Sequence, residues 1–343
     1  MDRARYERQI AFREIAVEGQ EKLARGSALI VGCGALGTTV AVLLARMGVG
    51  RLVLVDRDFV AFSNLPRQAL FDEEDARTCL PKVEAARRKL AAINSELKID
   101  AHAAHLGRDN IADLARGVDI ILDGMDNFDT RMLVNDYSIA SSTPWIYAAV
   151  LGATGLSMNV LPGETPCLRC LFREPPGPDA PTTETEGVIA PVIRVIGAVE
   201  AAEAAKLLLG RRAEMSRKLT SVDLWRSEFR SMDISLVRED SDCPVCMHGR
   251  FDWLRGDRGV ARAVRSAGTV VHLEGPGRPV DLNALARRLP ADGVTANPFL
   301  VRFERHPYVL TIFADGRAIV EGTGDLALAQ KLYDECVLQR GDP

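Results

Sequence analysis

The chain lacks the features that mark membrane, secreted or nucleic-acid-binding proteins. Its 343 residues contain no apolar run near the ~20 residues that a membrane-spanning helix needs. No apolar stretch follows the charged start, Met1 to Arg5, so we expect no secretory signal peptide. The formal net charge of −4 provides no basic excess to attract nucleic acid or an anionic membrane. We therefore expect a cytoplasmic protein that binds neither.

Internal repeats and unusual composition are also absent. Hydrophobic residues make up 47% of the chain and charged residues 26%, which is enough apolar material for a sizeable core. The length suggests one large domain plus a smaller one, or two domains of similar size.

The seven cysteines cannot all pair, and four of them form two CxxC motifs. Without a secretion signal, this pattern favours metal over disulfides. Four thiolates suffice for a closed tetrahedral zinc site, and each motif has a proline beside it, Pro166 or Pro244. Buried free thiols or redox chemistry are the alternatives, although a redox CxxC usually stands alone. The predicted Zn²⁺ ligands are Cys167, Cys170, Cys243 and Cys246.

Apolar strands alternate with helical patterns in the first part of the chain. Residues 28–32 and 51–56 have the pattern of buried strands, and residues 35–47 between them have helical spacing. Such a β-α-β unit implies a parallel sheet. Further elements are expected as helices near 82–93, after 126 and at 198–209, and as strands at 119–123 and near 145. We therefore predict an α/β fold with a Rossmann-like, doubly wound sheet.

Breaks in the pattern suggest the domain organisation. Residues 173–191, rich in Pro and then in Thr and Glu, are expected to form an exposed loop. We predict an ATP-binding domain with the zinc site over 1–250, a linker over 251–265 and a small α+β domain over 266–343. In the last domain we expect strands at 270–273 and 299–303, helices at 282–289 and 326–338, and a hairpin turning at Asp315-Gly316.

A GxGxxG motif, Gly32 to Gly37, stands between a predicted strand and a predicted helix. Its glycines, Gly32, Gly34 and Gly37, let backbone amides approach phosphate at the helix N-terminus. Asp56 ends the next strand, close to the ~20-residue separation expected of a ribose-binding acid. We predict nucleotide binding here rather than a tight turn without a ligand, but the motif alone does not distinguish NAD from ATP.

Charged residues after successive strands favour nucleotidyl transfer. Arg67 and Lys82 can neutralise phosphate charge, and Asp126 can hold Mg²⁺. Alone, each would be interpreted as a solvated surface residue, but together they follow strands at the switch-point edge of the sheet. An NAD-dependent oxidoreductase needs no such set, and an intact set argues against a binding module without catalysis.

Together these motifs resemble the ThiF/MoeB/HesA family, relatives of the ubiquitin-activating enzymes. The resemblance covers about residues 5–247. The matching segments are Tyr6 to Ile10, Gly32 to Gly37, Asp56-x-Asp58, Ser63 to Gln68, Pro81 to Glu84, Asp126-Asn127, both CxxC motifs and Gly187 to Pro191.

The resemblance implies an adenylyltransferase that binds ATP with Mg²⁺ and adenylates the C-terminal glycine of a ubiquitin-fold sulfur-carrier protein. It implies that Asp126 ligates Mg²⁺ and that Arg8 reaches the ATP of the partner subunit in a homodimer. It further implies that Asp56 holds the ribose and that Asn64, Arg67 and Lys82 contact the phosphates. The nucleotide-binding set then comprises Gly32, Gly34, Gly37, Asp56, Asp58, Asn64, Arg67, Gln68, Lys82, Asp126 and Asn127, with Arg8, Arg67, Lys82 and Asp126 as the catalytic residues.

Two regions depart from the family pattern. Thr183 stands where many relatives have a cysteine, and a hydroxyl is a far weaker nucleophile than a thiol. Either the enzyme stops at the adenylate, or another thiol takes over, such as Cys79 if the nearby Lys82 lowers its pKa. Family members that modify peptides also lack this thiol, so a peptide or another carboxylate remains an alternative substrate. Residues beyond about 262 would hold the carrier, extend the dimer or stabilise the fold.

Overall fold

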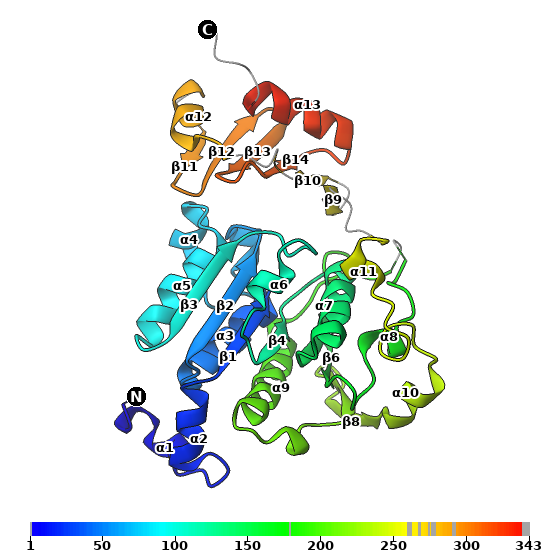
Figure 1. Cartoon of the computed structure of the whole chain (residues 1–343). Coiled ribbons are helices and arrows are strands. Elements are labelled where there is room, and N and C mark those ends of the chain that lie inside the picture. The colour runs from blue at the N-terminus through cyan, green and yellow to red at the C-terminus, as the bar shows by residue number, and fades with distance from the viewer. Residues whose placement is uncertain are drawn as a thin grey trace. The chain divides into compact units, whose positions relative to one another are not determined.

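The computed structural model describes residues 2–177, 180–258, 263–266, 269–273, 275, 279–289 and 293–337. The chain divides into two units (Figure 1). Unit 1 comprises Met1–Asp75 and Pro81–Gly259, and unit 2 comprises Ala76–Leu80 and Val260–Pro343. Parts of three predicted segments lie outside the described residues: 178–179 of the loop, 259–262 of the linker and 338 of the last helix.

Unit 1 is built on an eight-stranded sheet with the order β3-β2-β1-β4-β5-β6-β7-β8. The five strands from β3 to β5 are parallel, and the strands from β5 to β8 pair antiparallel. The order reverses between β1 and β4, which confirms the Rossmann-like prediction. The bounds are β1 Ser27–Val31, β2 Arg51–Asp56, β3 Lys98–Ala103, β4 Ile120–Asp123, β5 Trp145–Leu151, β6 Thr154–Val160, β7 Lys218–Asp223 and β8 Glu228–Asp233.

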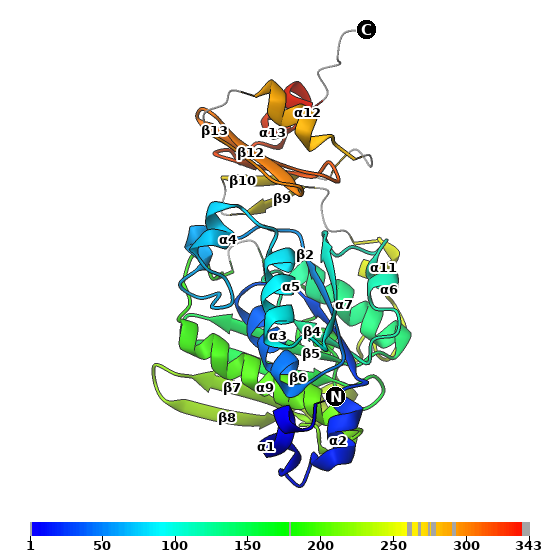
Figure 2. The ribbon, with the colours of Figure 1, turned by 90° about the vertical axis from the view of Figure 1, so that its left-hand side faces the viewer.

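Helices cover both faces of the sheet, which explains why β1 and β4 are buried along their whole length. Figure 2 shows α3 (Ala35–Met47), α5 (Lys82–Ile93) and α9 (Ala190–Leu208) on one face. On the other face lie α6 (Ile111–Leu114), α7 (Phe128–Ser141) and α11 (Asp252–Arg255). The helix expected at 198–209 begins earlier, at Ala190, because Pro191 is tolerated in a first turn. The remaining helices of the first 250 residues are α1 Glu7–Ile10, α2 Ala16–Leu23, α4 Glu73–Arg77, α8 Leu168–Leu171 and α10 Ser235–Asp240.

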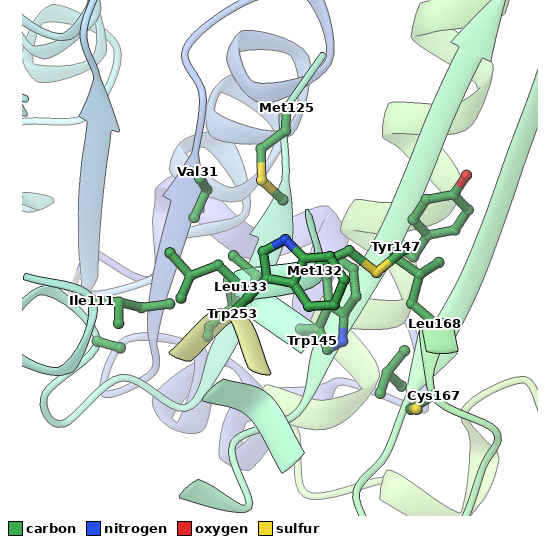
Figure 3. Close-up of a cluster of buried hydrophobic side chains, with 14 of the residues drawn as sticks. Val31, Ile111, Met125, Met132, Leu133, Trp145, Tyr147, Cys167, Leu168 and Trp253 are labelled. Atoms are coloured by element: carbon green, nitrogen blue, oxygen red, sulfur yellow. The ribbon is translucent and has the colours of Figure 1, made fainter. Parts of the chain in front are cut away.

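The core on the α7 face packs aliphatic side chains around a few large aromatic ones (Figure 3). It joins Met132 of α7, Trp145 and Tyr147 of β5, and Trp253 of α11. The same cluster includes Cys167, so the core continues without interruption to the first CxxC motif.

Asp136 of α7 is buried beneath α11. One oxygen accepts hydrogen bonds from the backbone N–H groups of Trp253 (2.9 Å) and Leu254 (3.4 Å). Its other oxygen has no hydrogen-bond partner among the described residues. Burial raises the pKa of Asp136 from 3.8 to about 7, although these N–H donors and Arg169 oppose the shift. Between pH 3.8 and about 7, the Asp136 carboxyl is therefore protonated in the folded state and ionised in the unfolded chain.

We expect this proton to make stability depend on pH. Because the folded pKa is the higher one, the contribution of Asp136 is complete below pH 3.8 and is lost as the pH rises through about 7. Asp136→Asn keeps the acceptor oxygen but carries no charge. Chemical unfolding at pH 5 and pH 8 should show the variant gaining on the wild type by on the order of 2 kcal/mol at the higher pH. A pH-independent difference between the two proteins would contradict this assignment.

Unit 2 contains an antiparallel sheet with the order β11-β12-β13-β14-β10-β9. Its core packs the sheet against α12 and α13. The expected hairpin is confirmed as β13 and β14, with Gly316 at φ +88° in the turn. The bounds are β9 Ala263–Ser266, β10 Val270–Leu273, β11 Val294–Ala296, β12 Leu300–Arg305, β13 Tyr308–Phe313, β14 Ala318–Glu321, α12 Leu282–Arg288 and α13 Leu326–Val337. Among the residues described in both units, no helix combines the length and apolar content needed to span a bilayer.

Candidate functional site

Two glycines of the GxGxxG loop, Gly32 and Gly37, allow close packing at the switch point between β1 and β4. A Cβ on Gly32 would lie 2.4 Å from the carbonyl oxygen of Gly124, and a Cβ on Gly37 would lie 1.8 Å from that of Gly32. Gly34 differs, because the nearest atom to its Cβ position is Gln68 Nε2 at 3.8 Å. The protein's own packing therefore does not require a glycine at 34. Its missing side chain leaves space over the N-terminus of α3, where a phosphate group fits.

Two carboxylates and a lysine lie beside this loop. Asp56 accepts hydrogen bonds from the backbone N–H groups of Cys33 (2.7 Å) and Asp58 (2.8 Å). Burial raises the pKa of Asp56 against the effect of Lys82, whose Nζ lies 3.0 Å from Asp58 Oδ2. Burial also opposes the charge on Lys82, but the carboxylates of Asp58, Asp56 and Asp126 outweigh it and raise the pKa of Lys82. The site thus holds a buried cation that stays charged at every physiological pH.

The loop after β2 brings Asn64, Arg67 and Gln68 to the same edge. The side-chain oxygen of Asn64 accepts from the backbone N–H of Ala61 (3.1 Å), which leaves its amide group for a ligand. Arg67 donates to the carbonyl of Ser63 (2.8 Å). Gln68 is only 3% exposed, and its Oε1 has no hydrogen-bond partner among the described residues. A buried acceptor left in this state beside Gly34 suits a donor group on a bound nucleotide.

Asp126 and Asn127 follow β4. The side-chain oxygen of Asn127 caps α7 by accepting from Thr130 N (2.9 Å), and its amide group lies 3.3 Å from Asp126 Oδ1. Asp126 is exposed and contributes to the raised pKa of Lys82. An exposed carboxylate at the edge of a phosphate site is a suitable Mg²⁺ ligand.

Sequence reasoning missed a buried network beneath this loop. Arg131 Nε lies 2.9 Å from Asp123 Oδ2, and Arg131 Nη2 donates to the carbonyls of Met125 (2.7 Å) and Ala148 (3.0 Å). Glu200 of α9 accepts from the backbone N–H of Asp123 (2.6 Å), and burial raises the pKa of Glu200 well above its usual range. The network fixes the loop that carries Asp126. The sequence offered one signal for this network, the acidic residue Asp123 at the end of the apolar strand β4.

Arg8 does not join the other predicted site residues. Its neighbour Gln9 donates to the carbonyl of Met47 (2.8 Å), the last residue of α3. α3 begins beside the glycine loop and has 13 residues, so its two ends are about 20 Å apart. The exposed Arg8 therefore lies at the far end of α3 from the phosphate loop of its own chain.

The four predicted zinc ligands come together. Cys167 Sγ lies 3.8 Å from Cys170 Sγ and 3.6 Å from Cys243 Sγ, and Cys170 Sγ lies 3.4 Å from Cys246 Sγ. All four sulfurs are within 4.8 Å of one another. Zn–S bonds of about 2.3 Å in a tetrahedron place sulfurs about 3.8 Å apart, so the donor set fits a zinc ion.

Neither Cys79 nor Thr183, the two positions considered for covalent chemistry, has the surroundings of a reactive nucleophile. Burial raises the pKa of Cys79, so the idea that a neighbouring cation lowers it is wrong in direction. The opposing cation is Arg302 rather than Lys82. Thr183 is half-buried in a loop whose other threonines, Thr182 and Thr185, hydrogen-bond to each other.

Comparison with known proteins gives a consistent picture. The ThiF family model matches residues 6–245. The chain is 38% identical over 336 residues to a sulfur carrier protein ThiS adenylyltransferase of Bacillus subtilis (strain 168), covering 97% of this chain and 99% of that protein. The protein of the same name from Escherichia coli (strain K12) is 39% identical over 246 residues, covering 71% of this chain and 95% of that protein.

Solved structures of E. coli MccB are similar in fold. The complex of MccB with MccA-N7isoASN has a TM-score of 0.61 and 26% identity, and covers 72% of this chain and 74% of that one. The structure of MccB with ATP has a TM-score of 0.59 and 27% identity, and the match covers 71% of this chain and 73% of the MccB chain.

Proposed function

Because this chain belongs to the ThiF family, whose adenylyltransferases use ATP, we propose that it adenylates the C-terminal carboxylate of a ubiquitin-fold sulfur-carrier protein. The observation that carries the proposal is the match to the B. subtilis ThiS adenylyltransferase, which spans both proteins almost completely. Activation of the carrier as an acyl-adenylate would prepare it for sulfur transfer.

The reaction places demands that the site residues can meet. A carboxylate attacks the α-phosphate of ATP and pyrophosphate leaves, so two anions must approach each other. Backbone N–H groups of the Gly32–Gly37 loop would donate hydrogen bonds to phosphate oxygens. Lys82 and Arg67 would neutralise the negative charge that develops on the phosphates. Asp56 and Asp58 would hold the ribose end, and Asn64, Gln68 and Asn127 would complete the contacts. Mg²⁺ held by Asp126 would neutralise phosphate charge.

Dependence of ATP–pyrophosphate exchange on the added carboxylate tests the substrate class. We expect exchange with a ubiquitin-fold carrier ending in Gly-Gly and none with the same carrier lacking its last glycine. The alternative, a peptide substrate, is motivated by the MccB structure in complex with N-formylated MccA and by Thr183. Exchange supported by peptides but by no carrier would replace the proposal with this alternative. NAD should not compete with ATP.

We further propose that the acyl-adenylate is the last species formed on the enzyme. Residues 171–242, which include the loop of Thr183, contain no cysteine, and burial keeps the Cys79 thiol protonated. An external nucleophile would then attack the adenylate directly. Mass spectrometry of the enzyme trapped with ATP and carrier would reveal any thioester on Cys79 or ester on Thr183, and either adduct would refute this proposal.

We also propose a homodimer in which Arg8 completes the partner's site, because Arg8 lies too far from its own phosphate loop. We expect Arg8→Ala and Asp126→Ala homodimers each to lose nearly all pyrophosphate exchange. Mixed after subunit exchange, they form heterodimers with one intact site, so about a quarter of wild-type activity should return if the chains mix at random. Arg13→Ala, another exposed arginine near the N-terminus, is the control and should retain activity. Absence of recovery after demonstrated subunit exchange would contradict donation between subunits.

A further inference from the structure

The segment Ala76–Leu80 belongs to unit 2, although the chain on both sides of it belongs to unit 1. The two residues that follow are Pro81 and Lys82, and Lys82 is the first residue of α5. The backbone N–H of Lys82 donates to the carbonyl of Asp58 (2.9 Å), the residue whose carboxylate pairs with its side chain. The segment therefore leads directly into the buried cation of the candidate site.

Asn297, which also belongs to unit 2, contacts the backbone carbonyl groups of Thr78 and Cys79 in this segment. Its Nδ2 donates to the carbonyl of Thr78 (2.9 Å) and lies 3.4 Å from that of Cys79. Its Oδ1 accepts from the backbone N–H groups of Phe299 (2.8 Å) and Leu300 (3.0 Å) in the turn between β11 and β12. Since the turn fixes the oxygen, the amide group is held pointing at the segment.

The contacted backbone is strained. Cys79 has φ +49°, a left-handed conformation that non-glycine residues avoid. Such a conformation persists only where surrounding contacts hold it, and it is concentrated at functional sites. The thiol of Cys79 is buried and lies 3.7 Å from the carbonyl of Ala76. Contacts thus restrain both parts of Cys79: Ala76 contacts its side chain, and Asn297 contacts its backbone carbonyl.

We propose that Asn297 is a positioning residue, which holds the strained turn at Cys79 and thereby fixes the start of α5 and the place of Lys82. The inference rests on the proposed function, because it assumes that Lys82 acts on the phosphates. The match to the E. coli relative takes up 95% of that protein and 71% of this chain, which leaves no room there for a unit like unit 2. The positioning of Lys82 by Asn297 would therefore be restricted to family members that have a C-terminal unit like unit 2. It would give unit 2 a role in catalysis.

Asn297→Asp tests the proposal in the full-length protein. Aspartate keeps an oxygen for the turn but replaces the donor with an oxygen that repels both carbonyls. Asn283→Asp makes the same chemical change at an exposed position of α12 and is the matched control. Hydrogen–deuterium exchange of peptides covering residues 76–84 should become about fivefold faster or more in Asn297→Asp alone. Pyrophosphate exchange should fall about tenfold in kcat with KM for the carrier nearly unchanged, since misplacing a charged group acts mainly on the transition state.

Equal deuterium exchange in Asn297→Asp and wild type would overturn the proposal. So would faster deuterium exchange with kcat equal to that of Asn283→Asp, because the segment would then be held without positioning Lys82. If Asn297→Asp does not fold, Asn297→Ser replaces it, since serine can serve the turn but is too short to reach Thr78. Wild-type protein that shows no pyrophosphate exchange with any carrier or peptide would refute the proposed function, whereas the deuterium comparison would still decide whether Asn297 holds the segment.

Discussion

Asp126→Ala is expected to lower ATP–pyrophosphate exchange by at least a hundredfold while the protein remains folded. The carboxylate is exposed, and within the described part of the chain its hydrogen-bond partner is the Asn127 amide at 3.3 Å, so its removal should leave the packing of the loop intact. Its proposed partner is Mg²⁺, which would neutralise charge on the phosphates and on the leaving pyrophosphate. Loss of a stabilising charge at a reacting phosphate costs a factor on the order of 10² to 10³ in rate.

The network beneath the loop explains why the fold should survive. Asp123, Arg131 and Glu200 hold the backbone from Asp123 to Met125 through hydrogen bonds in which Asp126 takes no part. Asp129→Ala, three residues further on, is the matched control because that exposed carboxylate lies toward Trp253 of α11. Normal exchange by Asp126→Ala, measured with a substrate that the wild type accepts, would show that the metal site is wrongly assigned.

Arg67 and Lys82 are not equivalent tests of the same idea. Among the described residues, the guanidinium of Arg67 hydrogen-bonds only to the carbonyl of Ser63, so an effect of Arg67→Ala on rate would report on catalysis. Lys82, in contrast, balances the carboxylates of Asp58 and Asp56 in a buried position. Removing one partner of a buried pair typically costs about 3 to 5 kcal/mol of stability, so Lys82→Ala would mix folding with catalysis.

Local patterns explain how much of the fold and site could be predicted from the sequence. Residues 28–56 contain, in order, a strand, a glycine loop, a helix, a second strand and an acidic residue. This order was enough to predict that Gly32, Gly34 and Asp56 lie at one edge of the sheet. The CxxC motifs were found in the same way, because two thiols three residues apart can share one ion.

Contacts between distant segments could not be predicted. Glu200 is 77 residues from Asp123, and no periodicity links a glutamate on an apolar helix to a particular strand end. Asn297 is 219 residues from Thr78, and nothing in the sequence suggested that Ala76–Leu80 belongs with the C-terminal unit. The antiparallel strands β6, β7 and β8 were also missed. Strand β8 is exposed along most of its length, so it lacks the apolar signal of the parallel strands.

Cys243→Ser is expected to abolish zinc binding and to destabilise unit 1. The wild type should contain about one zinc per chain, because four thiols at tetrahedral spacing make a closed structural site. The ion would join two segments 76 residues apart, α8 and the turn after α10. Both belong to the core that contains Trp145, Tyr147 and Trp253, so the loss should spread beyond the site.

The size of the effect follows from the coupling of metal binding to folding. Unfolded chain does not present four thiolates at this spacing, so the binding free energy of the ion contributes to folding. We expect the midpoint of thermal unfolding to fall by on the order of 10 °C or more. Cys336→Ser, which changes a half-buried thiol of α13 that is not in the cluster, should retain both zinc and stability. Metal analysis and thermal unfolding of the three proteins decide the matter: wild type that is fully folded and free of zinc would refute the assignment, because the four thiols would then be a buried cluster that needs no ion.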